Sequence, residues 1–408
     1  MVRKSVLMLN TGIDPIPPLV GGAIEYHVFN LSKALAKLKW NVHLISNVDR
    51  TRNSYAVELI PGVTVYKCSG LEFIKKRDWF SNLLLYSGSG LIVPIKSLQV
   101  QRIRKCSIIH AHQPTHVFML KGFFKEDTPI VFTLHYANPY IIQSENFLHQ
   151  FIRRKIFWEI FVRKAEELVE KIIVLNSCTK EEMIKEGFSP RKLIFVPNGI
   201  DVNFYIQVSS KKAKRYVASK YGLTYKRFCL YVGRLVKEKG IDLLIKAFSQ
   251  INHNIPLVIV GEGPELEHLK RLAHDLHCEK KIIFLGKLTR LELRYLYRSA
   301  MYLLLLSKAE AFPSTLLESL ASGLPVIASD ISIMREVLKD KMLSKFIVKR
   351  TEIEELKDTL IEAINIAVNK PEEYAELIER CRSISLNYDW KIIAKKVISV
   401  YEEILSGY

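Results

Sequence analysis

Two glutamates, Glu310 and Glu318, lie eight positions apart in the segment MYLLLLSKAEAFPSTLLESLASGLPVIASD. The apolar run Tyr302–Leu306 predicts a strand before them, and the residues from Ser314 onward predict a helix. We expect Ser314 to cap that helix, because serine is a favoured N-cap residue. The free N–H groups and partial positive charge of a helix N-terminus suit a phosphate group. A phosphate site flanked by two carboxylates that accept hydrogen bonds from hydroxyls fits a sugar nucleotide.

The same segment also has an ordinary structural explanation. Strand, loop, helix, glycine and strand is a common α/β order, and a glutamate near a helix start often only complements the helix dipole. The segment EAFPSTLLESLASGLPVIAS resembles the Glu-x7-Glu signature of retaining glycosyltransferases of family 4, which have the GT-B fold. The resemblance implies that Glu310 binds donor-sugar hydroxyls and that Glu318 binds the ribose. It also implies that the amides of Ser314 and Thr315 hold the donor diphosphate.

A second group of polar residues follows the predicted strand Phe228–Val232. Arg234 and Lys239 could hold a diphosphate, the arginine by its fork of N–H groups and the lysine as a point charge. A solvated basic loop is the structural alternative. The segment LYVGRLVKEKGIDLLIKAF resembles the Gly-Arg…Glu-Lys-Gly element of the same family, which implies the diphosphate role for both residues. In FLGKL, the resemblance implies that the backbone at Leu288 helps to hold the nucleotide base.

Gly21 and Gly22 follow the first predicted strand, Val6–Asn10, and precede a helix predicted over Gly22–Leu38. Glycines allow close backbone approach, and a helix start again offers N–H groups to an anion. A Gly-Gly pair alone is a weak signal, because tight turns use it often. It resembles the glycine loop of the same family, which implies contacts with the donor phosphates. The chain contains neither a G-x-G-x-x-G fingerprint nor a Walker A motif.

Histidines stand at the ends of two predicted strands, His110 and His112 in IIHAHQP and His135 in VFTLHYANPY. Imidazole can donate a hydrogen bond to a sugar hydroxyl or a phosphate oxygen. Paired histidines also occur in metal sites, but no third ligand is near them in the sequence, so we expect no metal. The resemblance implies that His135 contacts the donor sugar near its anomeric carbon. For His110 and His112 it implies a structural or acceptor-side role.

The absence of one motif bears on whether the protein needs a metal or cofactor. The chain has no Asp-x-Asp pair, which metal-dependent GT-A glycosyltransferases use to bind a cation with the diphosphate. We therefore expect no cofactor and no metal, with a nucleotide diphospho-sugar as the donor substrate.

Apolar strand candidates alternate with amphipathic helices along the chain, which predicts a doubly wound α/β fold. The remaining predicted strands are Val42–Ser46, Val63–Lys67, Ile108–His110, Ile130–Leu134, Ile172–Asn176, Leu193–Val196, Leu257–Val260, Ile282–Leu285 and Val326–Ser329. A break in the alternation near residue 200 indicates two Rossmann-like domains. We expect an acceptor-side domain at 1–200 and a nucleotide-sugar donor domain at 201–387.

The C-terminal segment NYDWKIIAKKVISVYEEIL predicts one more amphipathic helix. Its apolar residues recur at helical spacing: Trp390, Ile393, Val397, Val400 and Tyr401. The segment 388–408 resembles the closing helix of GT-B enzymes, which implies that it crosses back to the N-terminal domain. Ligands of open α/β sheets bind at the carboxyl ends of the strands, so we expect the site in a cleft between the domains.

Composition bounds the class of protein. With 408 residues, 49% hydrophobic and 25% charged, the chain is typical of a two-domain globular protein. It has no apolar run of ~18 residues, so no transmembrane helix is expected, and its apolar start is too short for a signal peptide. Six scattered cysteines without CxxC pairs indicate reduced thiols in the cytoplasm and argue against zinc: Cys68, Cys106, Cys178, Cys229, Cys278 and Cys381.

The net charge of +18 is compatible with nucleic acid, an anionic lipid surface or a phosphorylated substrate. Because no nucleic-acid motif accompanies it, we rank the inner face of the cell membrane first and expect no nucleic acid; a solvated basic surface is the alternative. The basic aromatic segment 147–168 is compatible with a membrane-surface helix or a core helix. The segment 81–95 reads equally as an acceptor or membrane loop or as core.

These observations converge on a retaining glycosyltransferase that moves a sugar from a nucleotide diphospho-sugar to an acceptor hydroxyl. Lipid-linked and polysaccharide glycans are the acceptors we consider. No residue stands out as a covalent nucleophile, so we expect a front-face reaction in which the leaving phosphate takes the acceptor proton. Two alternatives stay open. One is another GT-B enzyme, such as a sugar-nucleotide epimerase or a phosphorylase. The other is a non-catalytic basic adaptor that binds membrane or nucleic acid.

Overall fold

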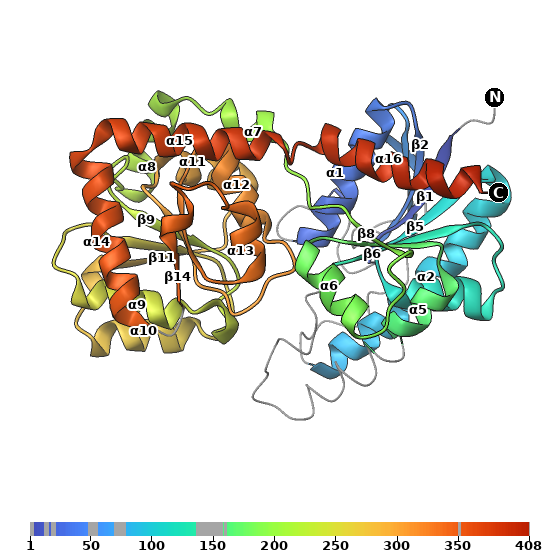
Figure 1. The fold of residues 1–408 in the computed structure, drawn as a ribbon, viewed down its shortest axis with the longest axis horizontal. Coiled ribbons are helices and arrows are strands. Elements are labelled where there is room, and N and C mark those ends of the chain that lie inside the picture. Colours follow the sequence, from blue (N-terminus) through green and yellow to red (C-terminus); the bar gives the residue numbers. More distant parts are fainter. Residues whose placement is uncertain are drawn as a thin grey trace. The chain divides into compact units, whose positions relative to one another are not determined.

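The computed structural model describes residues 4–11, 16–17, 22–47, 56–68, 79–135, 158, 161–349 and 352–407. The chain divides into two units (Figure 1), each with its own sheet. Unit 1 is Met1–Gly199 together with Trp390–Tyr408, and unit 2 is Ile200–Asp389. The α/β class with two parallel-sheet domains is confirmed. Among the helices described, none combines the length and apolar character that a membrane crossing requires.

Unit 1 contains an eight-stranded sheet in the order β3-β4-β2-β1-β5-β6-β7-β8. The strands are β1 Ser5–Leu9, β2 Asn41–Asn47, β3 Ala56–Ile60, β4 Val63–Cys68, β5 Ile108–Ala111, β6 Ile130–Leu134, β7 Lys171–Val174 and β8 Leu193–Phe195. All neighbours pair in parallel except β3 and β4, which form an antiparallel pair. The carboxyl ends of the seven parallel strands therefore share one edge of the sheet.

Alternate residues of the strands in unit 1 pack on opposite faces, as the pleat requires. Val6 and Met8 join the cluster formed with α1, Ala23–Lys37, and α16, Trp390–Ser406. Leu7 joins the cluster on the other face. That face is covered by α2 Trp79–Arg104, α3 Pro114–Val117, η1 Phe118–Phe123, α5 Arg163–Leu168 and α6 Ser177–Lys185 (Figure 1). Both faces of the sheet are thus buried, which explains why its inner strands read as continuous apolar runs.

The predicted C-terminal helix is present as α16 and packs against α1 (Figure 1). All five residues that predicted it are buried: Trp390, Ile393, Val397, Val400 and Tyr401. Gly199 approaches the Trp390 indole so closely that a Cβ there would lie 2.5 Å from two ring carbons. A side chain at position 199 would collide with the Trp390 ring, so the close contact of this residue with the start of α16 requires glycine.

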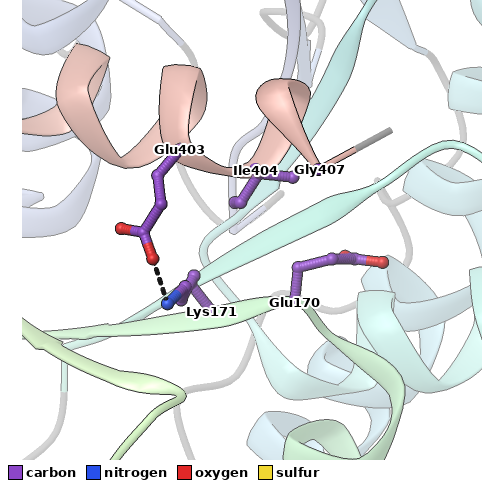
Figure 2. A pocket seen from close by; sticks show the side chains of 5 residues that line it. All are labelled: Glu170, Lys171, Glu403, Ile404 and Gly407. Carbon is purple, nitrogen blue, oxygen red and sulfur yellow. Dashed lines mark hydrogen bonds and ion pairs between the residues drawn. The ribbon is translucent and has the colours of Figure 1, made fainter.

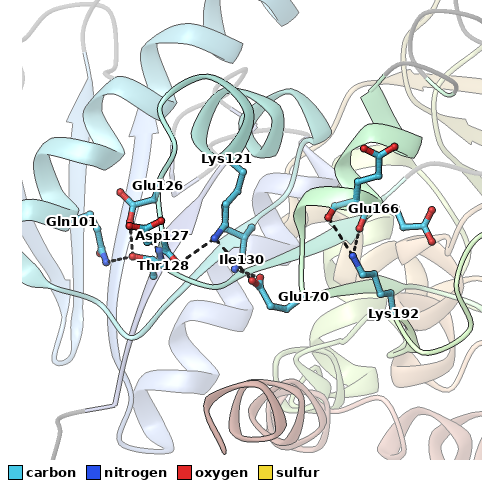
Figure 3. Close-up of polar contacts among 10 residues, drawn as sticks. Gln101, Lys121, Glu126, Asp127, Thr128, Ile130, Glu166, Glu170 and Lys192 are labelled. Carbon is cyan, nitrogen blue, oxygen red and sulfur yellow. Dashed lines mark hydrogen bonds and ion pairs between the residues drawn. The ribbon is translucent and has the colours of Figure 1, made fainter. Parts of the chain in front are cut away.

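Polar contacts fasten the opposite, amino-terminal edge of the sheet in unit 1. Lys171 at the start of β7 donates to Glu403 of α16 at 2.6 Å, beside a hollow of about 270 Å³ (Figure 2). Its lining residues are Glu170, Lys171, Glu403, Ile404 and Gly407. The amide of Ile130 donates to Glu170 Oε2 at 2.5 Å, and Gln101 Nε2 donates to Thr128 Oγ1 at 2.8 Å (Figure 3). We assign these contacts to the fold, because the ligand-binding edge of such a sheet is the carboxyl one.

Unit 2 contains a six-stranded parallel sheet in the order β11-β10-β9-β12-β13-β14. The strands are β9 Cys229–Val232, β10 Leu257–Val260, β11 Ile282–Gly286, β12 Leu303–Leu305, β13 Val326–Ser329 and β14 Ile347–Val348. Every residue of β9, β10, β12 and β13 is buried. These central strands are covered on both faces, as expected for a parallel sheet.

Helices of unit 2 form two groups, which meet where α14 contacts α15. One group contains α9 Ile241–Gln250, α10 Leu266–Asp275 and α14 Ile353–Asn369. The other contains α7 Val202–Ile206, α8 Ser210–Tyr221, α11 Arg290–Ser299, α12 Ser314–Ser322 and α15 Pro371–Leu386. Shorter elements complete the unit: η3 Lys237–Lys239, η4 Glu279–Lys281, α13 Ser332–Val337 and η5 Ser344–Phe346.

The segments 81–95 and 147–168 each have two possible interpretations from the sequence. Of the two interpretations left open for 81–95, the loop is excluded, because these residues lie inside the long helix α2. Most of 147–168 lies outside the described residues. Within that segment Trp158 is fully buried, and its Nε1 donates to Glu186 Oε2 at 2.8 Å, so this aromatic residue belongs to the core.

Candidate active site

Glycines bring together the loops that follow β9 and β10 in unit 2. Gly261 has a φ of +145°, and a Cβ on it would lie 1.8 Å from the carbonyl oxygen of Gly233. The hydroxyl of Tyr231 donates to the carbonyl of Arg234 at 2.9 Å and fixes the first turn after β9. Arg234 itself is exposed at the carboxyl end of that strand. Its guanidinium is therefore accessible where parallel sheets bind ligands.

Lys239 and Glu310 are brought together from loops 71 positions apart and form an ion pair between Nζ and Oε1. The amide of Lys308 donates to the carbonyl of Glu238 at 2.8 Å and joins the two loops. Ser307 Oγ also donates to Glu310 Oε1, at 2.7 Å. The side chains of Lys239 and Glu310 are 25% and 15% exposed. The two side chains thus neutralise each other, and each remains partly accessible to a ligand.

The helix after Glu310 begins one residue later than predicted. Pro313, with φ −72° and ψ 119°, is the N-cap of α12, and Ser314 is its first helical residue. The prediction that Ser314 caps the helix is therefore wrong: its backbone is already helical, and no side-chain hydrogen bond caps α12. The amides of Ser314 and Thr315 remain in the first turn, where backbone N–H groups have no acceptor within the helix.

Glu318 lies inside α12 and is almost completely buried, with 4% of its side chain exposed. Arg290 Nη2 lies 2.8 Å from Glu318 Oε1, and the hydroxyl of Tyr297 donates to Oε2 at 2.8 Å. Burial and the neighbouring Glu318 charge hold the pKa of Tyr297 well above its usual value, so Tyr297 stays a donor. A carboxylate has about four acceptor positions, so lone pairs remain for other hydroxyls.

Sequence reasoning missed Arg290, although it lies only two residues after Leu288. Thr289 caps α11 and forms a reciprocal capping box with Glu292. The cap fixes where α11 begins and thereby places Arg290 and Tyr297, seven positions apart, on one face of the helix. Leu288 is half-buried immediately before the cap.

Gly22 begins α1 in unit 1, with φ 73° and ψ 72°, while Gly21 lies outside the described residues. This left-handed conformation favours glycine because it has no Cβ. The Gly22 carbonyl accepts from the amide of Tyr26 at 2.9 Å and closes the first turn.

His110 has a structural position in unit 1. Its Nδ1 lies 2.6 Å from the hydroxyl of Tyr401 on α16, and its Nε2 lies 2.6 Å from Thr133 Oγ1 on β6. Burial, together with nearby His27, lowers its pKa to about 3. Both ring nitrogens are therefore engaged inside the core, which leaves His110 without a nitrogen to offer a ligand.

His112 and His135 meet at the carboxyl ends of β5 and β6. His112 Nδ1 lies 2.9 Å from His135 Nε2, and His135 is half-buried where His112 is fully buried. A third imidazole, His27 of α1, lies edge-on to His135 with 4.7 Å between ring centroids. Burial holds the pKa of all three well below the usual value, to about 4 for His27, so the rings are neutral at neutral pH. Sequence reasoning missed His27, since a histidine within an amphipathic helix carries no signal of its own.

Two glycosyltransferase family models match successive parts of the chain. Residues 20–204 match the model "Glycosyltransferase Family 4", and residues 218–383 match "Glycosyl transferases group 1". The GPI3 subunit of a phosphatidylinositol N-acetylglucosaminyltransferase from Saccharomyces cerevisiae is 21% identical, over 95% of this chain and 81% of that protein.

Solved structures extend the similarity to the whole fold. A sucrose-phosphate synthase from Thermosynechococcus elongatus has a TM-score of 0.80 at 19% identity, covering 100% of both chains. Anabaena HepE in complex with UDP and glucose has a TM-score of 0.73 at 18% identity, covering 98% of this chain and 100% of the other. The two family matches succeed one another along the chain, one mainly in unit 1 and the other in unit 2. The chain therefore belongs to family 4 of the glycosyltransferases and has the GT-B fold.

Proposed function

We propose that this protein is a retaining glycosyltransferase that moves a sugar from a nucleotide diphospho-sugar to an acceptor hydroxyl. The observation that carries the proposal is the pairing of Lys239 with Glu310 in unit 2, one cation and one carboxylate on adjoining loops. A donor phosphate would replace Glu310 as the partner of Lys239. The released carboxylate could then accept hydrogen bonds from hydroxyls of the transferred sugar.

The other proposed donor contacts are of two kinds, those to the diphosphate and one to the ribose. Arg234, Lys239 and the amides of Ser314 and Thr315 would neutralise the charge that develops on the leaving diphosphate, usually the largest catalytic contribution. Glu318 would accept from the ribose, with its carboxylate already oriented by Arg290 and Tyr297. These groups would make a cofactor and a metal on the diphosphate unnecessary.

Three further contacts come from the family resemblance. The backbone at Leu288 would hold the nucleotide base. Gly21 and Gly22 would contribute backbone contacts to the donor phosphates. We propose no side-chain role for these three residues.

The reaction would proceed on one face of the sugar. The bond between the anomeric carbon and the phosphate oxygen breaks, and the acceptor oxygen bonds to the same face of that carbon. The acceptor hydroxyl proton passes to the leaving phosphate oxygen, so no protein nucleophile is needed. Neutral His135 would donate a hydrogen bond to the sugar beside the reacting carbon, and burial favours that uncharged form.

The acceptor is proposed to be a lipid-linked or polysaccharide glycan. The yeast relative is a subunit of a phosphatidylinositol N-acetylglucosaminyltransferase, and HepE was solved with UDP and glucose. A net charge of +18 supports attraction to an anionic membrane surface. We accordingly propose a cytoplasmic enzyme at the periphery of the inner membrane face.

A two-stage experiment tests the function. Calorimetry with UDP-, GDP- and ADP-sugars should identify a donor that binds wild-type protein and binds Lys239→Ala protein much more weakly. That donor is then incubated with lipid extracts, and mass spectrometry and NMR identify the product and its anomeric configuration. A product with the donor's configuration is expected. Donor turnover without acceptor would instead indicate an epimerase, and no nucleotide-sugar binding at all would indicate a non-catalytic adaptor.

A further inference from the structure

Three histidines from distant parts of the sequence converge in unit 1. His27 lies on α1, His112 follows β5, and His135 follows β6. One ring nitrogen from each lies within 4.8 Å of the others. The convergence exists only in the folded unit, because the three positions are separated by more than 80 and by more than 20 residues.

The hydrogen bonding of His27 identifies which of its nitrogens carries a lone pair. Asn198 Oδ1 accepts from the amide of Gly199 at 3.0 Å, so this atom is the amide oxygen. His27 Nδ1 lies 2.9 Å from the same oxygen and must therefore donate its proton to it. Nε2 of the neutral ring is then an acceptor. It is buried and has no hydrogen-bond partner among the described residues, which calls for an explanation.

His112 and His135 form the other side of the cluster. The 2.9 Å contact between His112 Nδ1 and His135 Nε2 accommodates one shared proton between two neutral rings. When a metal ion binds at both nitrogens, the ring that donates this proton takes up its tautomer with the proton on the other nitrogen, so each ring stays neutral and offers one lone pair. His27 Nε2 is already without a proton and would need no such exchange.

We propose that His27, His112 and His135 bind one divalent transition-metal ion, with Zn²⁺ as the best chemical fit. Neutral imidazoles suit zinc, copper, nickel and cobalt, whereas Mg²⁺ and Ca²⁺ prefer oxygen ligands that these three side chains do not offer. Zn–N bonds of about 2.0–2.1 Å place tetrahedral nitrogens roughly 3.3 Å apart. The three nitrogens now lie within 4.8 Å of one another, so the rings would have to move to reach that value on binding. Asn198 would orient His27 from the outside, as second partners of metal-binding histidines do.

The ion would join α1 to the ends of β5 and β6 and thereby stabilise unit 1. This site goes beyond the proposed transfer reaction, and the proposal departs from the expectation, drawn from sequence spacing, that the chain has no metal. His135 is common to this site and to the proposed reaction, since its Nε2 would bind the ion while its Nδ1–H would donate to the sugar. The side chains of the donor diphosphate contacts all lie in unit 2. Metal binding can therefore be measured without donor, acceptor or turnover.

The test uses untagged full-length protein that has been freed of metal with a chelator and dialysed. ZnCl₂ is titrated by calorimetry and the bound ion is counted by mass spectrometry. CoCl₂ is titrated in parallel, because tetrahedral Co²⁺ gives strong visible absorption bands. One ion per chain, tetrahedral Co²⁺ bands and an upward shift of Tm with ZnCl₂ are expected. Absence of binding at micromolar metal, or octahedral Co²⁺ alone, overturns the proposal even without any variant.

Matched variants then locate the ion. His27→Gln should weaken Zn²⁺ binding about 100-fold or more and abolish the Tm shift, and Asn198→Ala should weaken it about 10–100-fold. His43→Gln changes a partly buried histidine of β2 outside the cluster and should leave binding unchanged. Equal affinities in His27→Gln, His43→Gln and wild type would show that the ion binds elsewhere. Circular dichroism verifies that each variant is folded.

Discussion

Arg290 and Glu318 form an ion pair in unit 2, with 2.8 Å between Nη2 and Oε1. Glu318 is 4% exposed and Arg290 22% exposed, so the pair lies at the boundary between the core and solvent. Tyr297 donates to the second carboxylate oxygen at 2.8 Å. A buried carboxylate is tolerated only when it is paired and hydrogen-bonded. The two α11 residues therefore fix both the position and the orientation of the carboxylate on α12.

Removing the cation should destabilise unit 2. In Arg290→Met the carboxylate stays buried without its charged partner. We expect a loss of roughly 3 kcal/mol in the free energy of unfolding, the lower end for a broken buried pair because Arg290 is partly exposed. Urea denaturation followed by circular dichroism measures this change.

The control for this substitution is Arg271→Met on the exposed face of α10, which should change stability by less than about 0.5 kcal/mol. The double variant Arg290→Met with Glu318→Gln removes both charges and should recover part of the loss. Equal stability of Arg290→Met and Arg271→Met would contradict a buried, supporting ion pair.

Lys239→Ala and Glu310→Ala should each nearly abolish sugar transfer. Lys239→Ala removes a preorganised positive charge that would stabilise the leaving diphosphate, which typically costs about 10²–10³ in kcat. Glu310→Ala removes the carboxylate that would hold the hydroxyls of the transferred sugar, so the sugar is no longer positioned for reaction. Both residues lie outside the central strands, Lys239 in the short helix η3 and Glu310 in a loop, so the fold should be retained. Lys308→Ala, an exposed lysine on the same loop as Glu310, is the matched control and should keep near-normal turnover. Near-normal turnover in both site variants would remove Lys239 and Glu310 from the proposed site.

Local patterns predicted most of the fold. The strands were recognisable because buried parallel strands are short apolar runs, as at Val6–Leu9 and Leu257–Val260. The closing helix was recognisable because Trp390 and Tyr401 share one face at helical spacing. In each case the signal lies within a few turns or a single strand, so a single sequence contains it.

Other features depended on information that the local sequence lacks. Residues 56–60 form β3 with an exposed first half, so its apolar signal is weak. β14 is only two residues long. The N-cap of α12 is Pro313, one position before the predicted Ser314. Extended and helical backbone conformations compete at a helix start, so the sequence does not fix the exact residue. His27 and Arg290 acquire their partners only when distant segments pack together, and no periodicity encodes such a meeting.

Gly261→Ala should be strongly destabilising because the added Cβ would lie 1.8 Å from a backbone oxygen. A backbone atom cannot change rotamer, so the loops after β9 and β10 must separate. We expect a cost above about 3 kcal/mol, the upper end for overpacking. Gly222→Ala is the control: Gly222 also has a positive φ, of +65°, but nothing lies within 4 Å of the added methyl, so about 1–2 kcal/mol is expected. Similar thermal stabilities of the two variants would contradict the close approach of Gly261 to Gly233.

Stability should fall as the pH decreases from 6.5 toward 4, in part because of His43. Arg104 Nε donates to the hydroxyl of Tyr66 at 2.8 Å, so that hydroxyl can donate its own proton to His43 Nδ1, 3.2 Å away. Burial, assisted by the Arg104 charge, lowers the pKa of His43 to about 4. The unfolded chain, with a histidine pKa near 6.5, therefore binds a proton in this pH range that the folded chain does not.

The contribution of His43 is fully present above pH 6.5 and is lost progressively as the pH falls to about 4. Because His43 is partly exposed, the loss should be roughly 1–2 kcal/mol, less than the full 1.4 kcal/mol per pKa unit. Urea midpoints at pH 7.5 and pH 5 measure it in metal-free protein. His43→Gln should reduce the difference between the two midpoints, whereas His268→Gln, at an exposed position on α10, should not. An unchanged pH dependence in His43→Gln would mean that Tyr66 does not hold His43 in its neutral form.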